Sequence, residues 1–203
     1  MPRMSRRNFI KVTAGLGAAG SLLPLRGLLS RSPLEGLMAA PRSGPGRRPL
    51  VISTWKHGWP ANEAAWKILA SGGSALDAVE AGVRVSEGDP EVNGVGYGGL
   101  PDEECRVTLD ASIMGPDYRA GAVAFIENYR HPISIARRVM ETTDHVFIVG
   151  AGAEEFARKH GFAREELLTE AAREAWINWK RTLGDADDWF PADLDHDTIG
   201  MTA

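Results

Sequence analysis

The sequence predicts an α+β fold from residue 49 onward, on three observations. Short apolar and β-branched runs, typical of strands, occur at 49–55, 106–114, 120–125 and 146–149. Stretches with helical periodicity lie between and after these runs. A Gly-Gly pair separates two of the helical stretches. With 203 residues, 43% of them hydrophobic, the chain is long enough to bury a core.

The first expected elements are a buried strand at 49–55 and two consecutive helices. Asn62 is expected to cap the first helix, because its side chain can accept a backbone hydrogen bond. Ser74 with Asp77 three residues later predicts a capping box for the second helix, which should end at about Ser86. Small residues along this second helix favour close packing against a sheet.

A glycine-rich loop follows at 87–99. Its glycines permit positive φ and close backbone approach. It is not a phosphate loop, because it lacks Gly-Lys-Ser/Thr and carries carboxylates instead of cations. Two interpretations remain open: a loop under an active site, possibly with carbonyls turned toward a cation, or a structural crossover.

The rest of the body predicts a hairpin and then alternating helices and a strand. A Gly-Pro-Asp turn joins the hairpin strands. Trp176 and Trp179 are expected in the core, because their spacing places them on one helix face. The later elements are expected in this order: a helix at 132–142, a buried strand at 146–149, a helix at 151–160 and a longer amphipathic helix at 164–181.

Charge divides the sequence near residue 48. Residues 1–48 hold nine lysines and arginines against one acidic residue, whereas residues 49–203 hold 14 against 26. The acidic body argues against a nucleic-acid partner. The single cysteine, Cys105, excludes an intrachain disulfide and a cysteine-based metal site. No metal and no other cofactor is expected.

The basic head has the form of an export signal. Ser5-Arg6-Arg7-Asn8-Phe9-Ile10-Lys11 precedes a mildly apolar run and resembles a twin-arginine signal. Pro24 and Arg26 interrupt the run, so no stable membrane span is expected. We therefore expect a signal segment at 1–40, a linker at 41–48 and export to the periplasm.

The end of the sequence carries the candidate chemistry. An acidic, turn-rich segment at 182–197 predicts an exposed linker. Thr198 follows it. A threonine inside a chain is a poor nucleophile, but at a chain start its own α-amine, with a pKa of about 7.7–8.0, can act as the base. Cleavage of the Asp197–Thr198 bond would therefore supply both groups. The plainer alternative is an ordinary strand residue.

The motifs together resemble the glycosylasparaginase family of N-terminal-nucleophile hydrolases, over nearly all of residues 49–203. The resemblance implies cleavage at Asp197–Thr198 into an α and a β chain. It also implies a four-layer αββα sandwich, truncated here, with 49–197 as the α part and 198–203 as the start of β. The matching motifs are Ser53-Thr54-Trp55, Asn62-Glu63-Ala64-Ala65-Trp66, Gly72-Gly73-Ser74-Ala75-Leu76-Asp77-Ala78-Val79, Asp89-Pro90-Glu91-Val92-Asn93, Val95-Gly96-Tyr97-Gly98-Gly99, Pro101-Asp102-Glu103, Pro132-Ile133-Ser134 and His196-Asp197-Thr198-Ile199-Gly200-Met201.

The same resemblance implies the reaction and the residue roles. The family removes the sugar from the side-chain amide of glycosylated asparagine, a small molecule, giving aspartate and an amino sugar. Thr198 would be the nucleophile and, through its α-amine, the base. Asp197 would accept a proton or strain the bond during self-cleavage, with His196 in support, and Trp55 would line the pocket. The family's oxyanion threonine and the Arg and Asp that hold the substrate belong to the β region.

We therefore expect this chain to be inactive alone, to need the missing β subunit, and to assemble as (αβ)2. The nearest alternative is a plant-type L-asparaginase or isoaspartyl aminopeptidase. Those enzymes usually have glycine before the threonine, so Asp197 favours glycosylasparaginase. A non-catalytic binding module and an inactive truncated fragment also remain open.

Overall fold

The computed structural model describes residues 49–184 and 198–203, and their mixture of helices and sheets confirms the α+β class. In the described residues, β1 and β5 pair as one sheet, and β2, β3 and β4 form a second. The four layers of a sandwich are not established by these elements. In chain order they are β1 Ile52–Ser53, α3 Gly58–Ala70, α4 Ala75–Gly88, β2 Thr108–Met114, β3 Ala120–Glu127, α5 Pro132–Thr142, β4 Phe147–Val149, α6 Gly150–Lys159, α7 Glu170–Thr182 and β5 Met201–Thr202.

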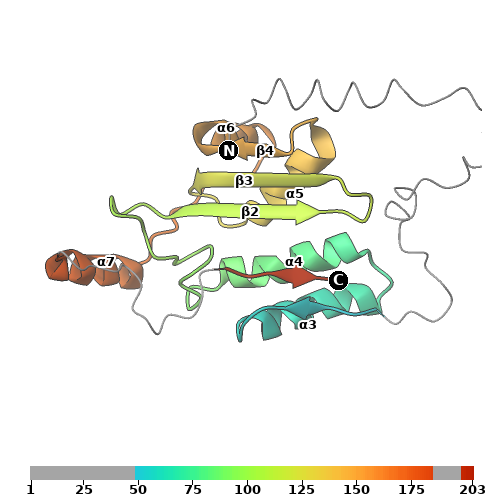
Figure 1. Cartoon of the computed structure of the whole chain (residues 1–203), viewed down its shortest axis with the longest axis horizontal. Helices are drawn as coiled ribbons and strands as arrows, with labels where there is room; N and C mark the ends of the chain where they lie inside the picture. Colours follow the sequence, from blue (N-terminus) through green and yellow to red (C-terminus); the bar gives the residue numbers. More distant parts are fainter. Residues whose placement is uncertain (1–48, 185–197) are drawn as a thin grey trace, which may run out of the picture. The chain divides into compact units, whose positions relative to one another are not determined.

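Helices α3 and α4 pack side by side (Figure 1). The capping box of α4 is confirmed: Asp77 N–H donates to Ser74 Oγ at 3.1 Å, and the Ser74 hydroxyl donates to Asp77 Oδ2 at 2.6 Å. The prediction that Asn62 caps the first helix is wrong, because α3 already begins at Gly58. Pro60 is tolerated near that start, where a backbone N–H has no intrahelical partner.

The second sheet contains the predicted hairpin, and its strands carry buried core side chains such as Val123 and Ile126. β2 and β3 are antiparallel, and β4 pairs parallel to β3. Helix α5 covers one face with Ile135 and Val139, both fully buried. Gly121 permits the close approach, since a Cβ there would lie 2.1 Å from the Ala136 carbonyl oxygen.

The first sheet is much smaller. β1 and β5 pair antiparallel, Ile52 opposite Thr202 and Ser53 opposite Met201. Helix α4 packs against β5, and Figure 1 shows the red β5 arrow alongside α4. The contact is tight: a Cβ on Gly82 would lie 2.5 Å from Met201 Sδ. The expected packing of small α4 residues against a sheet is therefore confirmed at this position.

Several expected elements differ from the structure. The strand at 49–55 is shorter and less buried, since Ile52 remains 54% exposed. β4 is also not buried as predicted, because Phe147 is 56% exposed. Helix α7 begins at Glu170 instead of 164, where Thr169 Oγ accepts the Ala172 N–H at 3.2 Å.

Two predictions concern side chains and segments beyond these sheets. The expected core position of Trp176 is only partly met: the side chain is half-buried and donates from Nε1 to the Glu103 carbonyl at 3.3 Å. The linker prediction for 182–197 falls mostly outside the described residues. Within the described part, no helix is both long and apolar enough to cross a membrane.

Candidate active site

Thr198 lies three residues before Met201, the first residue of β5, and hydrogen bonds to the residue after β1 continue toward it. Thr54 N–H donates to the Gly200 carbonyl at 2.9 Å. In return, Gly200 N–H donates to Thr54 Oγ1 at 2.9 Å. These reciprocal bonds fix the backbone two residues from Thr198, which itself is exposed. The chain thus presents Thr198 on a hydrogen-bonded strand end.

Two cavities meet at Thr198. The inner cavity has a volume of about 300 Å³, and the buried side chains of Val83 and Leu109 form part of its wall. The outer cavity has a volume of about 270 Å³ and is lined by the exposed residues Lys56 and Glu91. Thr198 therefore lines both cavities. The polar residues that line the inner cavity besides Thr198 are Glu87, Asn93, Thr108 and Asp110.

The glycine-rich loop forms a wall common to both cavities through its 93–95 segment. Its shape is held by backbone hydrogen bonds, among them Tyr97 N–H to the Glu87 carbonyl at 2.8 Å. Gly96 has φ +65°, and a Cβ there would lie 2.0 Å from the Glu87 carbonyl oxygen. Only glycine fits this approach. The geometry favours the active-site interpretation of the loop over a simple crossover.

Glu87 connects this loop to the start of α5. Its carboxylate is almost fully buried; Oε1 accepts the Ile133 N–H at 2.9 Å, and Oε2 lies 3.3 Å from His131 Nδ1. His131, the residue before α5, makes no side-chain cap, so Glu87 takes that role. Burial raises the pKa of Glu87, and His131 and the Ile133 N–H oppose the rise.

His57 lines the outer cavity beside Lys56. Its Nδ1 lies 3.3 Å from Ser86 Oγ, and the same hydroxyl lies 3.4 Å from the His57 carbonyl oxygen. Ser86 is 1% exposed, so the contact anchors one side of the imidazole to the buried end of α4.

The predicted site residues other than Thr198 have different outcomes. Trp55 follows β1 with φ +63°, is 48% exposed, and does not line either cavity in the described part of the chain. Its role as a pocket residue stays a prediction. Asp197 and His196 lie outside the described residues. Among the residues that the structure does describe, no three His, Cys, Asp or Glu side chains group to hold a metal.

Most of the cavity residues were not predicted from the sequence. Asp110 could have been recognised as a candidate site residue, since its carboxylate interrupts an otherwise apolar strand. The strand pairing shifts between Leu109 and Ala111, and Asp110 Oδ1 accepts the Phe125 N–H at 2.8 Å. Phe125 has φ +50°, which the side-chain acceptor helps to hold. Lys56 and His57 carried no comparable signal, because a turn with polar residues is common.

Comparisons with known proteins agree with these features. Residues 58–203 match the family described as asparaginase, and residues 3–22 match the twin-arginine translocation pathway signal sequence. The predicted export signal is thereby confirmed and supports export by the twin-arginine route.

Curated relatives include enzymes named for two activities. An N(4)-(beta-N-acetylglucosaminyl)-L-asparaginase of Elizabethkingia miricola is 46% identical over 201 residues, which are 98% of this chain and 56% of the relative. The Mus musculus enzyme of the same name is 46% identical over 64% of this chain and 38% of its own. A plant-type L-asparaginase of Pyrococcus abyssi is 46% identical over 62% of this chain and 42% of its own. The chain thus spans at most about half the length of these relatives.

Proposed function

The chain belongs to the asparaginase family, which includes the glycosylasparaginases, and on that premise we propose that the full-length protein hydrolyses the side-chain amide of glycosylated asparagine. The products are aspartate and an amino sugar. The observation that carries the proposal is Thr198, which is held at a strand end where two cavities meet.

In the proposed mechanism, Thr198 acts as an N-terminal residue. Its Oγ attacks the amide carbonyl carbon while its α-amine takes the hydroxyl proton. The carbon–nitrogen bond then breaks, the protonated α-amine returns the proton to the departing nitrogen, and an aspartyl ester remains on Oγ. Water attacks the ester and releases aspartate. The developing oxyanion requires hydrogen-bond donors, which we assign to the polypeptide after residue 203.

Self-processing is the step that creates this nucleophile. We propose that the Thr198 hydroxyl attacks the Asp197 carbonyl carbon, giving an ester that water hydrolyses. Asp197 acts as proton acceptor or strained element, and His196 supports it. Trp55 is proposed to line the pocket, since Thr54 just before it is hydrogen-bonded to Gly200.

The rest of the fold is proposed to come from the polypeptide that follows residue 203. One face of the β2–β3–β4 sheet is covered by α5, whereas Met114, Phe147 and Val149 are at least 50% exposed. Large apolar side chains on an open sheet face call for a covering layer. A second sheet there would complete a four-layer αββα sandwich, and two αβ units would assemble as (αβ)2.

The proposed organisation is a signal at 1–40, a linker at 41–48, the α part at 49–197 with an exposed acidic segment at 182–197, and β from 198. We further propose a periplasmic location. A second candidate function is that of a plant-type L-asparaginase or isoaspartyl peptidase, favoured by relatives of 45–47% identity with those names. An inactive fragment is the remaining alternative for the chain by itself.

The test uses the full-length protein, including the region that follows residue 203. Mass spectrometry is expected to show a β chain whose first residue is Thr198. Competing assays on glycosylasparagine, asparagine and a β-aspartyl peptide are expected to give the largest kcat/KM for glycosylasparagine. An intact precursor that never cleaves would refute self-processing, and a clear preference for asparagine would favour the second candidate. Residues 41–203 expressed alone are expected to show no turnover.

A further inference from the structure

We propose that Asn93 is a self-modification site, at which the backbone nitrogen of Gly94 attacks the Asn93 side-chain amide and ammonia is lost. The product carries a carboxylate, as aspartate or isoaspartate, in place of a neutral amide. The observation that carries the inference is an exposed Asn-Gly pair in a turn that lines both cavities with Thr198. The modification itself does not depend on the proposed function, whereas its effect on turnover rests on it.

The residue after Asn93 leaves its side chain open to attack. Gly94 has no Cβ, so nothing on it blocks the approach of its own nitrogen to Asn93 Cγ. Asn93 is exposed and Gly94 is only partly buried. In the described part of the chain, neither the Asn93 side-chain amide nor the Gly94 N–H makes a hydrogen bond. The two reacting groups therefore have no described partner to lose.

Asn93 and Gly94 are the two central residues of the turn from Val92 to Val95. Val95 N–H closes this turn on the Val92 carbonyl at 3.3 Å, which is longer than a usual backbone hydrogen bond. The Asn93 carbonyl accepts the Leu100 N–H at 2.9 Å, which holds the residue in place. The reaction therefore requires a local opening of the turn. It should be slower than in an unfolded chain, but it does not require the buried core to unfold.

The reaction balances with water as its only co-reactant. The Gly94 nitrogen loses its proton and bonds to Asn93 Cγ, the Cγ–Nδ2 bond breaks, and ammonia leaves with the proton. A cyclic imide remains. Water then opens it at Cγ to give aspartate, or at the backbone carbonyl carbon to give isoaspartate, in which the main chain runs through the side chain. Asparagine is among the chemically least stable side chains, which favours such a change at an accessible position.

The new charge would fall among groups that surround Thr198. A nearby carboxylate favours the protonated form of an amine, so it should hinder the Thr198 α-amine from acting as the base. The kcat/KM at neutral pH is expected to fall about three- to tenfold, and the acidic limb of the pH profile to move to higher pH. The charged or titratable residues that line the same two cavities are Lys56, His57, Glu87, Glu91 and Asp110.

The first test is peptide mapping by mass spectrometry of the full-length protein after prolonged incubation at mildly alkaline pH. The peptide that contains Asn93 should gain the mass that replaces an amide NH2 by OH, and should separate into aspartate and isoaspartate forms. Thr198→Ala should show the same gain, because no step of the modification uses Thr198.

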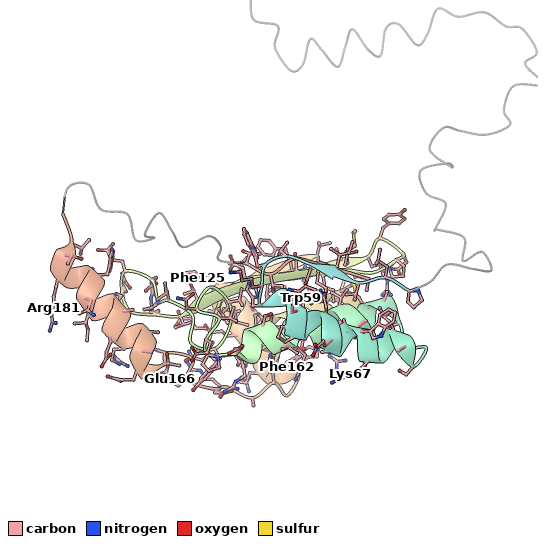
Figure 2. All side chains as sticks on the ribbon, turned by 90° about the horizontal axis from the view of Figure 1, so that it is seen from below. Trp59, Lys67, Phe125, Phe162, Glu166 and Arg181 are labelled. Atoms are coloured by element: carbon pink, nitrogen blue, oxygen red, sulfur yellow. The ribbon has the colours of Figure 1, made fainter. Side chains whose placement is uncertain are left out.

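Asn178 is the control within the same molecule. It is exposed on helix α7, near the end that Arg181 marks in Figure 2, but the bulky Trp179 follows it and the helix holds its backbone. The peptide that contains Asn178 should therefore keep its amide under the same conditions.

The second test measures the effect of the charge on turnover. Asn93→Asp carries the carboxylate from the start, and its pH profile of kcat/KM for glycosylasparagine is compared with that of the unmodified wild type. Asn178→Asp is the matched control, since it adds the same charge at an exposed position that lines neither cavity. Its profile should equal that of the wild type.

The outcomes separate the inference from the proposed function. If the Asn93 peptide keeps its amide as long as the Asn178 peptide does, the inference is overturned. A mass gain without isoaspartate overturns the attack by Gly94, since only the cyclic imide gives isoaspartate. A pH profile of Asn93→Asp equal to that of Asn178→Asp overturns the effect on turnover. Failure of the wild type to hydrolyse glycosylasparagine overturns the proposed function, while the mass measurement still decides whether Asn93 is modified.

Discussion

The two sheets of the described chain differ in how they are held. The β2–β3–β4 sheet is built on the long β2–β3 pairing and packs against α5, with Val123, Ile126 and Ile135 almost fully buried. The β1–β5 sheet pairs over two residues per strand and depends on α4 behind it. Thr198 lies three residues before β5 of the smaller sheet. This difference indicates that most of the stability and the position of the proposed nucleophile depend on different parts of the fold, so mutations can separate them.

The largest expected effect is a loss of activity without a loss of stability, caused by a mutation next to the smaller sheet. Thr198→Ala removes the attacking oxygen, so processing should stop and amide hydrolysis by the full-length protein should fall by about 10⁴-fold or more. Because Thr198 is exposed, the free energy of unfolding should change by less than about 0.5 kcal/mol.

Mass spectrometry of the purified protein and an assay of released aspartate provide the measurement. The matched control is Thr202→Ala, an exposed threonine on β5 that should leave both nearly unchanged. Cleavage at the same bond in Thr198→Ala would contradict the mechanism.

The second prediction is a loss of stability on mutation of the core beside the larger sheet. Ile135 is fully buried between α5 and the sheet, so Ile135→Ala should lower the free energy of unfolding by about 2–5 kcal/mol. Chemical denaturation measures this value, with exposed Arg138→Ala on the same helix as control. Activity per folded molecule should survive. A loss below 1 kcal/mol, about that of a surface change, would show that the core lies elsewhere.

The third prediction concerns the contact that supports β5. In Gly82→Ala the new Cβ would lie 2.5 Å from Met201 Sδ and 2.8 Å from the Ala61 carbonyl oxygen. Relieving these clashes should cost about 1–3 kcal/mol and displace the strand that carries Thr198. Processing, followed by gel electrophoresis over time, should therefore slow.

Gly152→Ala is the control for this change, because its Cβ would meet Ile148 Cγ2 at an ordinary 3.6 Å. It should process at the rate of the wild type. If both variants process alike, α4 is not what positions β5.

The smallest expected effect is a pH dependence of the free energy of unfolding. It arises from Glu87 at the end of α4, which contacts the start of α5. Burial raises the pKa of Glu87 above its ordinary value. For an acid with a raised pKa in the folded state, the stabilising contribution is present below the ordinary pKa and is lost as pH rises toward the raised one. Glu87→Gln keeps an acceptor for the Ile133 N–H and removes this loss.

The stability of the wild type relative to Glu87→Gln should therefore decline as pH rises through that window. Chemical denaturation at a series of pH values measures the difference, with exposed Glu63→Gln on α3 as control. If the wild type instead becomes more stable relative to Glu87→Gln as pH rises, then His131 lowers the pKa of Glu87 more than burial raises it.

Local sequence signals predicted local structure well. The Ser74–Asp77 capping box, the 106–125 hairpin and the helix at 132–142 are all confirmed. Helix starts were predicted less well, since several neighbouring residues can act as caps. The predicted cap at Asn62 is wrong, because α3 begins at Gly58. Helix α7 begins at Glu170, after the cap Thr169, and not at the expected residue 164. Propensity alone does not decide between neighbouring caps.

The candidate site was predictable only at Thr198, where the terminal motif is specific. Its cavity residues come from segments far apart in the sequence. Lys56 precedes α3, Glu91 lies on the glycine-rich loop, and Asp110 interrupts β2. Tertiary packing brings them together, and no local pattern reports it. The exposure of Phe147 was missed for the opposite reason, since an apolar strand reads as buried whether or not its covering layer is present.

Cutting the Asp197–Thr198 bond, as we propose, would change what the reciprocal hydrogen bonds between Thr54 and Gly200 connect. Before the cut they join two parts of one polypeptide; afterwards they become a seam between two subunits. The new chain start would then keep the position set by the subunit to which it was already paired. The proposed processing would therefore change which subunit Thr198 belongs to, while Thr54 and Gly200 stay paired.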